Sequence, residues 1–160
     1  MHRWAAVLAI GLAGNGVALA QEADVEPYVQ AFCGLRGVEG GAARIHLLSP
    51  ALTAEVMKAL AENARLQAET PDEKPPLGDG VPYQGFPDAA PVCEAGTVSR
   101  DGDAVVAEVK YSFPDGPDAG WTDRLVLVEG EGGVYDIDDI RYGADGDDTL
   151  RDTLEAAFDS

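Results

Sequence analysis

Aspartates crowd the end of the chain, where six of them occur between residues 136 and 148. Carboxylates this close together could ligate calcium or pair as a catalytic acid and base. A calcium loop of the EF-hand type needs glycine at its sixth position and glutamate at its twelfth. Counted from Asp145, those positions hold Leu150 and Ala156, so the EF-hand motif fails. A looser site of oxygen ligands stays open, with Asp136, Asp138, Asp145 and Asp147 as its candidates.

The pattern around these aspartates favours structural roles over a catalytic pair. In the segment VYDIDDI, Ile137 and Ile140 fall on opposite faces of a regular strand. A bulge near Asp138–Asp139 would return Ile140 to the core and leave the acids at the rim. Asp147 and Asp148 come just before a short amphipathic stretch, where acids satisfy free amides and the helix dipole.

The N-terminus has the layout of a secretory signal peptide. His2 and Arg3 precede an apolar run over residues 4–12, and Ala18-Leu19-Ala20 supplies a small-x-small cleavage pattern. The apolar run is shorter than the roughly 20 residues of a membrane span. We expect cleavage after Ala20, a periplasmic or secreted location, and no membrane span in the mature chain. A retained anchor segment is the alternative.

Two cysteines, Cys33 and Cys93, lie in the part of the chain expected to be exported. An isolated even pair in an oxidising compartment is most simply one disulfide. A redox or zinc role is disfavoured because there is no C-x-x-C and His46 is the one histidine after residue 20. Ser49 follows His46 closely, but no G-x-S-x-G motif surrounds any serine. We therefore expect no catalytic residues, no cofactor and no metal.

The chain is strongly acidic, with a formal net charge of −18. Loss of Arg3 with residues 1–20 would bring the mature chain to about −19. Nucleic acid and anionic lipid surfaces would repel such a protein. The same charge suits solubility, or docking to a basic protein. Residues 21–160 are enough for one domain with one core.

Helical periodicity is expected over residues 23–36 and again from residue 50 to about residue 68. Ser49 and Pro50 are typical of a helix cap followed by a first-turn proline. Residues 70–91 hold six of the ten prolines and predict an irregular connection. Its aromatics, Tyr83 and Phe86, would either dock a partner or be buried as the connection crosses the domain. The burial of both is the favoured expectation.

Strand patterns fill most of the chain after residue 91. Segments 92–99, 104–113, 123–129 and 134–140 read as strands, and Asp101-Gly102 is a hairpin signal. A short helix follows over residues 149–158, capped by Asp148 or Thr149. Helices followed by a run of antiparallel strands indicate the α+β class.

Several segments together carry a family resemblance: HLLSPALTAEVMKAL, DGDAVVAEVKY, RLVLVEGEGGVYDIDDIRY and TLRDTL. They resemble an uncharacterised family of exported bacterial domains that is similar to the nuclear transport factor 2-like superfamily. The resemblance spans about residues 25–156. At the place of Tyr135, members of that family commonly carry tryptophan.

This resemblance implies a cone-shaped α+β fold. A curved antiparallel sheet of about four strands would wrap the N-terminal helices, with a short C-terminal helix and a cavity at the open end. Some relatives, such as ketosteroid isomerases, use an Asp, His or Tyr inside that cavity. No such constellation is recognisable in this chain, so catalysis is not carried over.

The leading hypothesis is a monomeric, non-catalytic binding or protein-interaction domain, with a basic envelope protein as partner. The second is a small-ligand carrier or cavity enzyme of the cone fold. The third is a calcium-dependent binding module. The residues expected to contact a ligand or partner are Tyr28, Tyr83, Phe86, Tyr111, Trp121 and Asp139.

Overall fold

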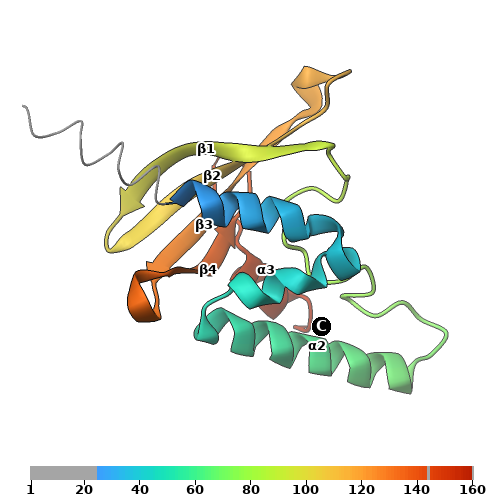
Figure 1. The fold of residues 1–160 in the computed structure, drawn as a ribbon. Coiled ribbons are helices and arrows are strands. Elements are labelled where there is room, and N and C mark those ends of the chain that lie inside the picture. The colour runs from blue at the N-terminus through green and yellow to red at the C-terminus, as the bar shows by residue number, and fades with distance from the viewer. Residues whose placement is uncertain (1–24, 144, 160) are drawn as a thin grey trace, which may run out of the picture.

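A four-stranded antiparallel sheet organises the fold, with its strands in the order β1-β2-β3-β4 (Figure 1). The computed structural model describes residues 25–143 and 145–159, so the expected signal peptide lies outside the described residues. The strands are β1 (Val92–Asp101), β2 (Ala104–Ser112), β3 (Trp121–Glu129) and β4 (Tyr135–Arg141). The predicted hairpin joins β1 to β2, and Gly102 takes the positive φ of 60° that this turn needs.

The predicted β-bulge in β4 is confirmed. Val126 pairs with Asp139 whereas Leu127 pairs with Ile137, so Asp138 is the extra residue on β4. Because of this insertion, both Ile137 and Ile140 are buried in the core despite their opposite parity in the sequence.

Three α-helices accompany the sheet within the described residues: one over residues 25–34, then α2 (Pro50–Glu69) and α3 (Leu150–Ala156). The first helix ends at residue 34 and not at residue 36 as expected, because a 3-10 segment, η1 (Leu35–Leu47), follows directly. Glu39, Gly40 and Gly41 break η1 with positive φ angles. The predicted cap of α2 is confirmed, since the Ser49 side chain accepts a hydrogen bond from the Leu52 N–H.

The cap of α3 is Thr149, whose side chain accepts from the Asp152 N–H. Of the two caps that the sequence predicted, Asp148 or Thr149, the structure has Thr149, and neither Asp147 nor Asp148 caps the helix. Asp148 instead accepts the Tyr142 N–H through its backbone carbonyl. A hydroxyl at the residue directly before the helix reaches the free amide, whereas the two preceding acids belong to the turn.

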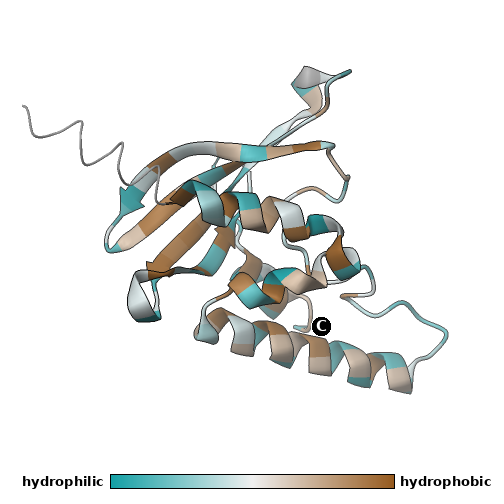
Figure 2. Ribbon diagram, viewed as in Figure 1, coloured by the Kyte–Doolittle hydropathy of each residue, from teal (hydrophilic) through white to brown (hydrophobic). Residues whose placement is uncertain are grey.

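The core lies between the sheet and the helices. Figure 2 shows hydrophobic residues concentrated along the central strands and polar residues along the connection after α2. Large side chains with less than 2% exposure include Phe32, Leu52, Tyr111, Leu125, Ile140 and Leu150. Among the described residues, no helix is both long and apolar enough to cross a membrane.

The disulfide between Cys33 and Cys93 is present and joins the first helix to β1. Its two Cα atoms are 5.7 Å apart, within the usual range for a disulfide. Such a cross-link is typical of oxidising compartments. Cys93 of β1 pairs with Tyr111 of β2, so the disulfide lies next to the C-terminal end of β2.

Candidate functional site

An aromatic cluster gathers where β2 ends and β3 begins. Tyr111 and Trp121 are cross-strand partners, and their rings stack with centroids 4.5 Å apart. Phe113 and Phe86 approach the indole of Trp121 at 6.3 Å and 5.5 Å. Tyr111 is buried, Trp121 and Phe113 are partly buried, and Phe86 is 49% exposed. The cluster therefore runs from the core to the surface.

Asp123 lies beside this cluster and is only 1% exposed. Its carboxylate accepts hydrogen bonds from three N–H groups: those of Gly85 at 2.8 Å, Gly143 at 3.0 Å and the Trp121 indole at 3.2 Å. A buried carboxylate needs such donors to offset its lost hydration. Asp123 thereby fastens the connection around Gly85 and the turn after β4, and it orients the Trp121 ring.

Gly85 permits this close approach. A Cβ atom at this position would lie 2.8 Å from a carboxylate oxygen of Asp123 and 2.9 Å from the Cβ of Tyr142. The hydroxyl of Tyr142 donates to the Pro82 carbonyl, so a second hydrogen bond holds the same connection. The segment before Phe86 is thus fixed against the sheet.

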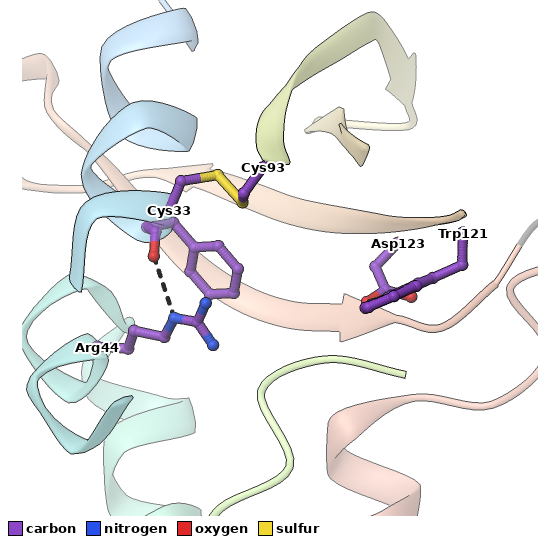
Figure 3. The surroundings of a disulfide bond; sticks show 6 residues. Cys33, Arg44, Cys93, Trp121 and Asp123 are labelled. Atoms are coloured by element: carbon purple, nitrogen blue, oxygen red, sulfur yellow. Dashed lines mark hydrogen bonds between the residues drawn. A yellow bond between two sulfur atoms is a disulfide. The ribbon is translucent and has the colours of Figure 1, made fainter. Parts of the chain in front are cut away.

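A buried arginine, Arg44, faces the same region from η1. It is 3% exposed, and its Nε donates to the Phe32 carbonyl at 3.0 Å (Figure 3). The guanidinium carbon lies 4.1 Å from the centre of the Phe32 ring and 5.9 Å from the centre of the Tyr83 ring. Aromatic faces stabilise a cation that has left water.

Arg36 also belongs to η1, and its guanidinium carbon is 6.0 Å from the centre of the Tyr111 ring. Within the part of the chain that the structure describes, three buried side-chain atoms have no hydrogen-bond partner: Nη1 of Arg36, Nη2 of Arg44 and the hydroxyl oxygen of Tyr111. Buried polar atoms are normally paired, so three in one neighbourhood are unusual.

Burial and charge perturb the ionisable groups here. Burial lowers the pKa of the Arg44 guanidinium and nearby Arg36 lowers it further, while the neighbouring Tyr111 opposes the shift. Burial also raises the pKa of Tyr83 to about 12 and shifts that of Tyr111 upward. Both phenols therefore remain neutral donors at neutral pH, and the Arg44 guanidinium remains charged.

The structure brings together four of the six predicted contact residues. Phe86, Trp121 and Tyr111 are in the aromatic cluster, and Tyr83 lies beyond Arg44. Tyr83 is 3% exposed, so its ring is unavailable as a surface contact, whereas Phe86 remains accessible. The expectation that the connection buries both aromatics therefore holds for Tyr83 alone.

Tyr28 and Asp139 lie elsewhere. Tyr28 makes an edge contact with the Tyr135 ring at 5.7 Å. Asp139 accepts the backbone N–H groups of Ile140 at 2.8 Å and Arg151 at 3.3 Å. Burial raises the pKa of Asp139, and these N–H donors act against that shift. Its bonds tie the β4 bulge to α3.

Asp138 completes this tie between elements. It accepts the Ser49 hydroxyl at 2.6 Å and the Arg151 Nη2 at 3.0 Å, and Arg151 also pairs with Glu55 of α2. Asp138 and Asp139 thus join β4 to α2 and α3. Over residues 25–143 and 145–159, no group of three His, Cys, Asp or Glu residues could hold a metal ion.

Two open clefts lie away from the aromatic cluster. One of about 520 Å³ runs between α2 and α3 and includes Ala59, Leu154 and Phe158 together with paired Arg151 and Glu55. The other, of about 680 Å³, runs between the first helix and β1. Its lining includes Val29 and Ala95.

Sequence reasoning missed Arg36, Arg44 and Asp123. For Asp123 a signal existed, since in WTDRLVLVE it shares the parity of Trp121, Leu125 and Leu127 and so falls on the core face. For Arg44 no periodic signal was available, because η1 contains a left-handed break and its contacts come from distant segments.

No family model, curated protein or solved structure matches this chain.

Proposed function

We propose that this chain is an exported, non-catalytic binding domain that contacts a basic partner protein through Phe86 and the aromatic cluster behind it. The observation that carries the proposal is the exposure of Phe86 in a segment fixed against the sheet. Exposed aromatics backed by a rigid scaffold are typical of binding hot spots.

The segment around Phe86 is also ordered internally. The side-chain amide of Gln84 donates to the Phe86 carbonyl at 2.7 Å and to the Asp88 carbonyl at 2.9 Å. A partner would therefore meet a preorganised aromatic side chain, and less conformational entropy would be lost on binding.

Acidic side chains accompany the aromatic surface. Asp88 follows Phe86, while Asp115 and Asp118 are exposed on the β2–β3 connection between Phe113 and Trp121. That connection projects from the body of the domain in Figure 1. With a net charge of −18 over the whole chain, this surface favours a partner with basic residues around an apolar pocket.

The non-catalytic part of the proposal rests on the hydrogen bonds of the candidate acids and nucleophile. Asp123 is fully engaged with N–H donors, and the Ser49 hydroxyl donates to Asp138. His46 is exposed on η1 and is not hydrogen-bonded to Ser49 in the structure. Fold class alone gives no activity, so we carry none over.

Export and the cone-shaped, nuclear transport factor 2-like fold are further parts of the proposal. The disulfide supports an oxidising compartment. The α+β order, the sheet of four strands and the short final helix support a cone with the aromatic cluster at its open end. We expect the domain to act as a monomer.

The test compares the exported domain with Phe86→Ala in affinity capture from a cell-envelope extract. Met57→Ala is the matched control, because Met57 of α2 is 54% exposed and lies outside the cluster. We expect wild type and Met57→Ala to retain a basic protein, with capture weakening as salt increases, and Phe86→Ala to lose it.

Unfolding curves of the two variants should match that of the wild type, since both side chains are exposed. Equal capture by Phe86→Ala, or a partner whose binding does not depend on salt, would contradict the proposal.

A further inference from the structure

We propose that Arg36, Arg44 and Tyr111 form a second, internal binding site that takes the carboxylate of a small monoanionic ligand. This inference is independent of the surface contact at Phe86. It starts from the three buried donor groups that lack a hydrogen-bond partner within the described residues.

The three groups come from two elements: both arginines belong to η1, and Tyr111 belongs to β2. Arg36 approaches the Tyr111 ring from η1 at 6.0 Å, and Arg44 interacts electrostatically with both Arg36 and Tyr111. Arg44 and Tyr111 are almost fully buried, since Arg44 is 3% exposed and Tyr111 is 1% exposed. A guanidinium group costs much free energy to bury, and leaving one of its nitrogens unpaired adds to that cost. An acceptor from outside the chain would satisfy all three groups.

The local charge selects a monoanion. Arg36 and Arg44 contribute two positive charges, and Asp123 contributes one negative charge to the same neighbourhood. The remaining charge of +1 is neutralised by one carboxylate. A phosphate dianion would leave an excess negative charge beside the buried Asp123 carboxylate, where repulsion is strong.

Donor chemistry favours a carboxylate as well. Planar guanidinium groups match the two oxygens of a carboxylate, and a neutral phenol adds a third donor. The Asp123 carboxylate does not satisfy them, because it accepts its hydrogen bonds from the N–H groups of Gly85, Gly143 and Trp121.

The surroundings favour an apolar body on the ligand. The Phe32 and Tyr83 rings lie against the Arg44 guanidinium, and Trp121 stacks on Tyr111. Arg36 and Trp121 are only partly buried, so a ligand would enter beside them. A flat carboxylate such as benzoate fits this combination of cationic and aromatic groups.

The test is calorimetric titration of the oxidised domain with benzoate. Benzyl alcohol and inorganic phosphate are the comparison ligands, because one lacks the charge and the other carries a second charge. We expect benzoate to bind with quenching or shift of the Trp121 fluorescence, and the other two to bind at least about tenfold more weakly.

Tyr111→Phe is the decisive variant, because it removes only the unpartnered hydroxyl. Its benzoate affinity should fall about tenfold, while its unfolding temperature without benzoate should equal or exceed that of the wild type. Arg36→Gln should also weaken benzoate binding. Tyr135→Phe should leave the benzoate affinity unchanged, because Tyr135 contacts Tyr28 at the other end of the domain.

Three outcomes would overturn the inference: no benzoate binding by the wild type, equal binding of benzyl alcohol or phosphate, or unchanged benzoate affinity in Tyr111→Phe. In each case the three donors would be satisfied by water only. Phe86→Ala should keep its benzoate affinity, so failure here is distinct from failure of the proposed partner contact.

Discussion

The disulfide gives the sharpest stability prediction. Replacing both Cys33 and Cys93 with alanine opens a loop whose ends are 60 residues apart in the sequence. In the chain-entropy model, a cross-link over a loop of about 60 residues removes about 14 cal/mol/K from the unfolded ensemble, or about 4 kcal/mol at 25 °C. We expect the double variant to lose about that much unfolding free energy.

Urea unfolding followed by circular dichroism measures this loss. The wild type treated with a reducing agent is the matched control, and its curve should coincide with that of the double variant. A thermal scan should show a decrease in the unfolding temperature of roughly 8–16 °C, given about 2–4 °C per kcal/mol for a domain of this size.

A loss below about 1 kcal/mol would refute the entropic reasoning. It would mean that the first helix and β1 already stay close in the unfolded chain, or that the cross-link strains the native state enough to cancel its effect. Unchanged stability on reduction of the wild type would refute it equally.

Two further predictions concern hydrogen bonding and pH. Ser49→Ala should cost about 2 kcal/mol, because it removes both the cap of α2 and the part-buried hydrogen bond to Asp138. Thr149→Ala removes the cap of α3 and only an exposed hydrogen bond to Asp152, so it should cost about 1 kcal/mol. Equal losses in urea unfolding would show that the Asp138 contact contributes nothing. Stability should also fall as the pH rises from about 10 toward 12, because burial raises the folded-state pKa of Tyr83 to about 12 while the unfolded side chain ionises near 10. This one phenol should make the unfolding free energy fall by close to about 1.4 kcal/mol per pH unit. If the urea midpoint of Tyr83→Phe falls with pH as steeply as that of the wild type, the prediction is contradicted.

Much of the fold follows from local signals. Ser49-Pro50 marked the start of α2, Asp101-Gly102 marked the β1–β2 hairpin, and the parity of Ile137 and Ile140 required the bulge in β4. Each of these depends on a few neighbouring residues whose conformational preferences agree with the tertiary structure.

The candidate site was less accessible from the sequence. Phe86 and Trp121 stood out by residue type, but nothing local distinguished the exposed Phe86 from the buried Tyr83 three residues earlier. Arg44 looked like an ordinary polar residue in a glycine-rich turn. Its burial depends on Phe32 and Tyr83, which come from other segments, so only the assembled structure shows it.

The two edges of the sheet bear on how this domain avoids aggregation. A sheet that ends in an open strand offers unpaired backbone groups to other chains. On the β4 side, Leu48 bridges to Ile137 and Thr149 bridges to Arg141, so neighbouring backbone already occupies part of that edge. On the β1 side, the register shifts between Ala95 and Val98, and this irregularity interrupts the straight row of amides and carbonyls that an incoming strand would need. The bridges beside β4 and the irregularity of β1 therefore hinder strand addition from a second molecule. This protection matters most at acidic pH, where protonated carboxylates no longer keep the chains apart.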